Sequence, residues 1–170
     1  LADYHGIAAD SISVTSGATE AIYLIAQAFR GSSSAVVVPT FSEYADACRL
    51  HSHRVDFISK PEEASSRYDM VWLCNPNNPT GRVWKASELY RIVRECPSTI
   101  FIVDQSYEYF SIAEVLDTKE AVSLPNLLLL HSLTKRFAIP GLRLGYLTAH
   151  ASLTERIRVC RMPWSVNALA

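Results

Sequence analysis

The feature that most constrains the fold is a series of short apolar segments that alternate with helical patterns along the chain. Several of them are apolar at nearly every position, which is typical of strands buried on both faces of a sheet. The strand candidates are residues 12–15, 35–38, 54–58, 71–74, 100–103, 126–130 and 144–148. Because such strands need helices over both faces, the sequence predicts an α/β protein with a three-layer αβα architecture and a mainly parallel sheet.

Helical patterns occupy most of the connections between these segments. In the first, Ile22, Ile25 and Phe29 recur on one stripe, as in a helix that packs against a sheet. The predicted helices are residues 19–30, 41–51, 87–95 and 152–162, with a polar loop at 59–67. The opening LADYHGI resembles a helix end, and Ser165 is typical of the N-cap of a further helix. With no initial methionine, we expect an internal piece of a longer protein.

Polar or aromatic residues follow five of the predicted strands. They are Ser16 with Gly17, Phe41, Asn78, Asp104, and the stretch from Ser132 to Lys135. In open α/β sheets, ligands bind at the carboxyl ends of the parallel strands. Five such features at one edge are less probable by chance than any one alone, so the sequence predicts a ligand site there.

Each of these features also has an ordinary structural explanation. Gly17 opens a helix whose free N–H groups suit a phosphate, although a simple N-cap has the same pattern. A lone aspartate after a strand, such as Asp104, is usually a turn or cap residue. Lys135 lies between an apolar segment and a Pro-Gly turn, where desolvation would make its amine a nucleophile, and a surface lysine is the alternative.

Composition excludes several other classes of protein. The net charge is -1 with no run of one sign, so we expect no binding to nucleic acid or to a membrane surface. No apolar stretch approaches a membrane span. The cysteines are widely spaced, which indicates free thiols in a reducing, cytoplasmic setting rather than disulfides or a zinc site. No glycine-rich nucleotide motif follows a strand, which disfavours a nucleotide-binding domain without covalent chemistry.

Taken together, the motifs resemble those of the fold-type I pyridoxal-phosphate enzymes of the aminotransferase class I/II group. The main ones are NPNNPTG at residues 75–81 and SLTKRFAIPGLRLGY at residues 132–146. SGATEA at 16–21, PTFSEY at 39–44, and the pair Asp104 and Tyr107 support them in the same order. The resemblance implies that residues 1–170 are the cofactor-binding large domain, with an N-terminal arm and a small C-terminal domain outside the chain.

The resemblance also implies a role for each motif residue. Lys135 would form the Schiff base with the cofactor and move the substrate Cα proton, and Asp104 would pair with the pyridine nitrogen. The ring would be held by Asn78 and Tyr107 at its phenolic oxygen and by Phe41 at its face, with Tyr44 a less favoured candidate for the face. The phosphate would be bound by Gly17, Ala18, Thr19, Ser132 and Arg143.

The subfamily is less sharply implied. Ser16, Gln105, Ser106 and His131 differ from residues frequent among relatives. The segment PWSVNALA at 163–170 is similar to the threonine-phosphate decarboxylases of cobalamin biosynthesis, and histidinol-phosphate aminotransferases share most motifs. We therefore expect a homodimer acting on an amino acid that is possibly phosphorylated, by decarboxylation or by transamination. A non-catalytic ligand-binding relative is the alternative of another class.

Overall fold

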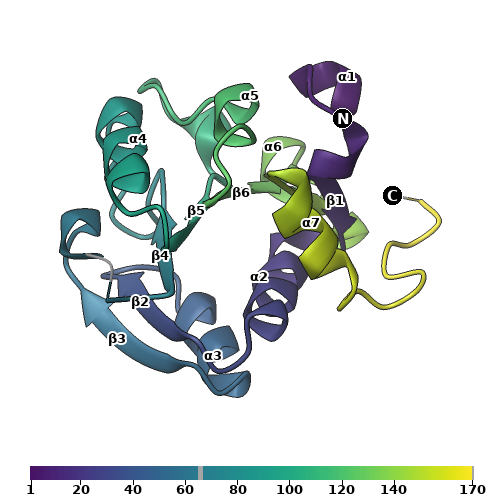
Figure 1. The fold of residues 1–170 in the computed structure, drawn as a ribbon. Coiled ribbons are helices and arrows are strands. Elements are labelled where there is room, and N and C mark those ends of the chain that lie inside the picture. The colour runs from purple at the N-terminus through teal and green to yellow at the C-terminus, as the bar shows by residue number, and fades with distance from the viewer. Residues whose placement is uncertain (65–66, 170) are drawn as a thin grey trace.

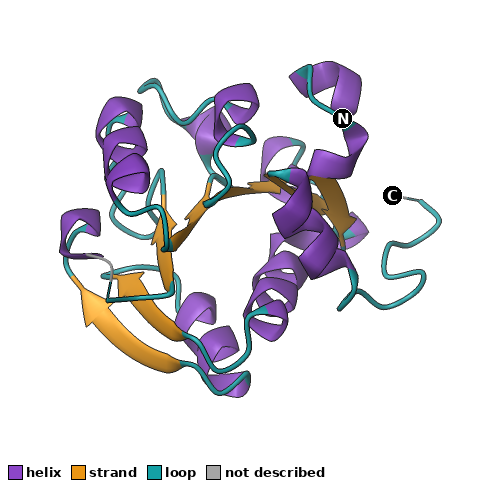
Figure 2. Cartoon of the chain, viewed as in Figure 1, coloured by secondary structure: helices purple, strands orange, loops and turns teal. Residues whose placement is uncertain are grey.

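The computed structural model describes residues 1–64 and 67–169, which form a three-layer αβα domain around one seven-stranded sheet (Figures 1 and 2). The strand order is β1-β7-β6-β5-β4-β2-β3, and β7 alone runs antiparallel to its neighbours. The strands are β1 (Ile12–Thr15), β2 (Ser33–Val37), β3 (Arg54–Ile58), β4 (Met70–Cys74), β5 (Ile100–Asp104), β6 (Leu127–Ser132) and β7 (Gly145–Ala149). The predicted α/β class and mainly parallel sheet are confirmed.

Helices cover both faces of the sheet, as the apolar strands require. One layer holds α2 (Gly17–Ala28), α3 (Glu43–Leu50) and α7 (Ala151–Arg158), and the other holds α4 (Ala86–Glu95) and α5 (Thr118–Ala121). Short helices α1 (Ala2–His5) and α6 (Leu133–Arg136) lie toward the β1 side of the sheet. No helix in the described part of the chain is both long and apolar enough to span a membrane.

Two apolar cores fill the spaces between the layers, because alternate strand residues point to opposite faces. Trp72 and Leu130 pack with α2 and α3, whereas Leu73 and Leu129 pack with α4. All four side chains are buried. The sheet is thus held from both sides, which makes its strand ends a rigid edge for a site.

Some predicted boundaries are wrong. Within the predicted polar loop at 59–67, Pro61–Ala64 form a 3-10 helix, and residues 65–66 lie outside the described residues. The last helix ends at Arg158 rather than at Met162. Val159 and Met162 are exposed, so an extension of the helix would gain no stabilisation from packing of these side chains. Among residues 163–169 no helix begins at Ser165.

The reversed direction of β7 matters for the site. A strand that runs antiparallel to the others begins at the edge where the parallel strands end. Gly145, the first residue of β7, pairs with Thr15 at the end of β1 and with Ser132 at the end of β6. Arg143, two residues earlier, is therefore delivered to the same edge as Asp104 and Ser132.

Candidate active site

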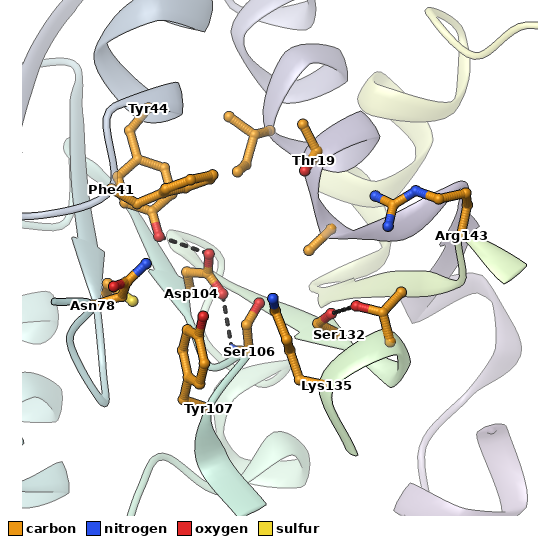
Figure 3. Close-up of a pocket in the computed structure, with 14 residues that line it drawn as sticks. Thr19, Phe41, Tyr44, Asn78, Asp104, Ser106, Tyr107, Ser132, Lys135 and Arg143 are labelled. Carbon is orange, nitrogen blue, oxygen red and sulfur yellow. Dashed lines mark hydrogen bonds between the residues drawn. The ribbon is translucent and has the colours of Figure 1, made fainter. Parts of the chain in front are cut away.

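A cavity of about 210 Å³ opens at this edge of the sheet (Figure 3). Every predicted site residue lines this cavity except Gly17. Gly17 lies against the guanidinium of Arg143, which does line it. The predicted residues in its wall are Ala18, Thr19, Phe41, Asn78, Asp104, Tyr107, Ser132, Lys135 and Arg143. The structure thus brings together side chains from five separate segments of the sequence.

Asp104 is the buried charge of the site. It ends β5, where the strand pairing sets it beside Cys74, and it is 4% exposed. Tyr44 Oη donates to its Oδ2 at 2.7 Å and the Ser106 N–H donates to its Oδ1 at 2.8 Å. Among the described residues no cation pairs with this carboxylate. A buried carboxylate with neutral donors only is suited to receive a cationic group of a ligand.

The groups around Asp104 hold their protons. Burial raises the pKa of Tyr44 well above its usual value, and the charge of Asp104 adds to the effect. Burial, with the same carboxylate, raises the pKa of the Cys74 thiol to about 12. Tyr44 and Cys74 are therefore neutral near pH 7 and bring no negative charge to the cavity.

The three asparagines of the NPNNPTG segment have separate tasks. Asn75 is fully buried and exchanges hydrogen bonds with the backbone of Trp84 at 2.8 and 3.1 Å. The Asn77 amide donates to Pro39 O and Thr80 Oγ1, which fixes the loop. Asn78 has no side-chain hydrogen bond among the described residues and lines the cavity. Its amide is free for a ligand.

The start of α2 forms an anion-binding surface. Glu20 accepts the N–H of Ser16, whereas the N–H groups of Gly17, Ala18 and Thr19 have no acceptor among the described residues. These groups stand at the positive end of a twelve-residue helix. The helix is open to an anion because its own first turn leaves these donors unused.

Arg143 completes this surface. Its guanidinium covers Gly17, where an added Cβ would meet Nη2 at 2.7 Å, and Gly17 also has a left-handed φ of +80°. Arg143 itself has a φ of +48°, an unusual conformation for a residue with a side chain. No carboxylate among the described residues pairs with it. Ser132, whose hydroxyl lies 2.7 Å from that of Thr134, flanks the same place.

Lys135 lies in α6 and its Nζ is 5.7 Å from the centre of the Tyr107 ring. It points into the cavity between Asp104 and Ser132 in Figure 3. The expectation that it would be desolvated is wrong for this structure, because its side chain is exposed. The structure brings the amine to the predicted edge of the sheet. How much of the surrounding chain covers it cannot be predicted from the sequence pattern.

Phe41 and Tyr44, the two candidates for covering the ring face of the cofactor, differ in their exposure to the cavity. Phe41 is 36% exposed and presents its ring to the cavity, whereas Tyr44 is 1% exposed and lies behind it. Their rings meet edge to face at 5.8 Å. Phe41 is therefore the residue able to cover a flat ligand.

Four lining residues are not among the predicted site residues: Ile22, Cys74, Ser106 and Thr134. A fifth, Tyr44, is predicted only as the less favoured candidate for the ring face. Two of these residues could have been found from their place in the sequence. Cys74 ends the strand next to that of Asp104, and Ser106 follows Asp104 by two residues. As a whole, the site suits a flat ligand with a cationic ring atom and an anionic group, next to a primary amine.

Comparisons with known proteins agree with this arrangement. The sequence model of the family "Aminotransferase class I and II" matches residues 1–170. The histidinol-phosphate aminotransferase of Desulfitobacterium hafniense (strain DSM 10664 / DCB-2) is 36% identical over 100% of this chain and 52% of its own. The threonine-phosphate decarboxylase of Salmonella typhimurium (strain LT2) is 34% identical over 100% of this chain and 51% of its own.

The fold of the chain is also similar to that of a solved structure. The crystal structure of L-threonine-O-3-phosphate decarboxylase from Porphyromonas gingivalis matches with a TM-score of 0.94 and 41% identity. The match covers 99% of this chain and 56% of that one. The chain thus spans about half the length of the relatives it matches.

Proposed function

The chain belongs to the aminotransferase class I and II family, and from this membership we propose that residues 1–170 form the pyridoxal-phosphate-binding large domain of an enzyme that acts on a small amino acid. The observation that carries the proposal is the convergence of three charged residues on one cavity. Asp104 comes from the end of β5, whereas Lys135 and Arg143 come from the stretch between β6 and β7, and all three line the same 210 Å³ space. None has a partner of opposite charge among the described residues.

The residues present fit the cofactor group by group. The buried carboxylate of Asp104 would hold the protonated ring nitrogen, because a cation there relieves the cost of a buried, unpaired charge. Asn78 and Tyr107 would hold the phenolic oxygen, and Phe41 would cover the ring face. The free N–H groups of α2, with Ser132 and the planar guanidinium of Arg143, would bind the phosphate.

The chemistry follows from the amine beside this ring site. When bound, the cofactor withdraws electrons from the bonds at the substrate Cα. Lys135 Nζ would hold the cofactor covalently between turnovers and carry the proton that leaves or reaches Cα. Tyr107, whose ring lies 5.7 Å from Nζ, would limit where that amine can swing.

We further propose a threonine-phosphate decarboxylase-like reaction on a phosphorylated amino acid, of the kind used in cobalamin biosynthesis. The support is the 41% identity to the Porphyromonas gingivalis decarboxylase and the decarboxylase-like PWSVNALA segment. Transamination of histidinol phosphate is the second candidate, favoured by the 36% identity to the Desulfitobacterium hafniense aminotransferase. We propose a cytoplasmic homodimer as the working form, and the free cysteines are consistent with a reducing compartment.

A first experiment tests cofactor binding in the full-length protein. Pyridoxal phosphate should produce a visible absorption band, and borohydride should then trap it covalently on Lys135, identified by peptide mass spectrometry. Lys135→Ala should lose the adduct, whereas Lys119→Ala, an exposed lysine in α5, should keep it. An adduct of the same yield and site distribution in Lys135→Ala would contradict the proposal.

A second experiment separates the two reactions. The full-length protein is incubated with phosphothreonine, or with histidinol phosphate and 2-oxoglutarate, and the products are identified by mass spectrometry. Carbon dioxide from phosphothreonine supports the decarboxylase assignment. Glutamate formed with histidinol phosphate, without carbon dioxide from phosphothreonine, would replace it by the aminotransferase.

A further inference from the structure

Tyr44 makes the only side-chain hydrogen bond to Asp104 within the described part of the chain. The residue lies in the first turn of α3, 1% exposed, and its Oη reaches across the core to Oδ2 at 2.7 Å. The other donor to the carboxylate is the Ser106 backbone, which belongs to the same loop as Asp104 itself. Tyr44 is therefore the link between this carboxylate and a separate structural element.

The tyrosine ring is fixed from two sides. Trp72 stacks on it with ring centres 6.1 Å apart and an angle of 23°, and Phe41 meets it edge to face at 5.8 Å. Trp72 is fully buried, and its Nε1 has no hydrogen-bond partner in the described structure. Packing rather than a polar contact thus holds Trp72, and the column from Trp72 through Tyr44 to Asp104 is rigid because each ring is confined.

The proton in this contact belongs to the phenol. Burial and the charge of Asp104 raise the pKa of Tyr44 well above its usual value, so Tyr44 is a permanent donor. Each Asp104 oxygen then receives one neutral donor, Tyr44 at Oδ2 and the Ser106 N–H at Oδ1. Two donors in fixed places set the plane of the carboxylate and stabilise its negative charge without neutralising it.

We propose that Tyr44 is a positioning residue, which holds the Asp104 carboxylate in the orientation that receives the cationic ring atom of the cofactor. This inference rests on the proposed function, because it assigns Asp104 to the cofactor. It adds a residue that contributes through Asp104 and not by covering the ring. The loss of the phenol should therefore weaken cofactor binding and slow turnover without changing how substrate binds.

The test uses the full-length protein with Tyr44→Phe, which removes one oxygen and keeps the ring between Trp72 and Phe41. We expect cofactor affinity, measured by absorbance titration, to fall about tenfold, as for a lost hydrogen bond to a charged group. We expect kcat to fall by a similar factor with KM changed less than about threefold. Tyr23→Phe is the matched control, because Tyr23 lies in α2 outside the cavity lining and its hydroxyl donates to Glu43 of α3 at 2.8 Å. It should match wild type.

A double-mutant cycle with Asp104→Asn asks whether Tyr44 contributes through Asp104. If it does, Tyr44→Phe should cause little further loss of affinity in the Asp104→Asn protein. Equal losses in both backgrounds would overturn the inference, as would wild-type affinity in Tyr44→Phe. A wild-type protein that binds no pyridoxal phosphate would instead overturn the proposed function.

A second pair of variants covers the case in which Tyr44→Phe does not fold. Replacement of Tyr44 by 4-aminophenylalanine keeps the shape and a donor, whereas 4-fluorophenylalanine keeps the shape without one. We expect the amino variant to bind the cofactor within about threefold of wild type and the fluoro variant about tenfold more weakly. Equal affinities of the two would contradict a positioning role for the donor.

Discussion

Gly145→Ala is the substitution whose effect follows most directly from the geometry. Gly145 begins β7 and lies directly under the start of α2. A Cβ at this position would lie 2.6 Å from Ala18 N, 2.8 Å from Gly17 C and 2.9 Å from His131 O. All three are backbone atoms, so no side-chain rotation can relieve the contacts. Either α2 moves away from the sheet or β7 separates from β6.

The size of the effect can be estimated from overpacking. Inserting one carbon into a packed interior costs about 1 to 3 kcal/mol. Because three backbone atoms are too close at once, we expect the upper part of this range, about 2 to 3 kcal/mol of the free energy of unfolding. The movement would also displace the free N–H groups at Gly17 and Ala18. Cofactor affinity should therefore fall together with stability.

The assay is urea unfolding of the full-length protein, followed by circular dichroism, with a cofactor titration under native conditions. Gly141→Ala is the matched control, because a Cβ there has open space and Gly141 has no left-handed φ. The control should differ from wild type by less than about 0.5 kcal/mol. A Gly145→Ala protein as stable as the control, with unchanged cofactor affinity, would show that the close approach is not a constraint.

Three further predictions concern single side chains. Arg143→Lys should lower pyridoxal-phosphate affinity about tenfold in an equilibrium titration, because an ammonium cannot make the bidentate hydrogen bonds of a guanidinium. Unchanged affinity would contradict the proposed role of Arg143 in binding the phosphate. Asn126→Ala should lower the free energy of unfolding, measured in urea, by about 2 to 3 kcal/mol, because this buried amide donates to three backbone carbonyls. A loss of less than about 1 kcal/mol would contradict this role of the amide. Cys74, with its pKa raised to about 12, should be roughly one part in 10⁴ thiolate at pH 8 and gain reactivity only as pH rises. Iodoacetamide should therefore label the half-buried Cys160 before it labels Cys74, as followed by mass spectrometry. Earlier labelling of Cys74 would refute the argument.

The strands and the site edge could be predicted because their signals are local. Most of the strands are short apolar runs closed by a polar or turn residue, and parallel strands must share one carboxyl edge. Asp104 and Ser132 were placed at strand ends for this reason, and the structure has them as the last residues of β5 and β6. The position of each residue along its own segment was sufficient.

The remaining features depend on packing between distant segments. The link from Tyr44 to Asp104 joins α3 to β5, and no local pattern indicates which side chain α3 turns toward the cavity. The helix α6 has four residues, too few to show a helical period, so the sequence predicts no helix at Lys135. Its exposure depends on what surrounds it in space, which is equally absent from a local pattern.

The place of β1 in the sheet has a consequence for the order of folding. Within the described residues β1 pairs with β7 and with no other strand, and this contact joins Ile12 to Thr148, far apart in the sequence. Closing so long a loop is slow compared with forming the neighbouring pair β6 and β7. Since α2 follows β1 directly, its N-terminus can meet Arg143 only after this closure. We therefore expect the capacity to bind the cofactor phosphate to appear late in refolding, after most of the sheet has formed.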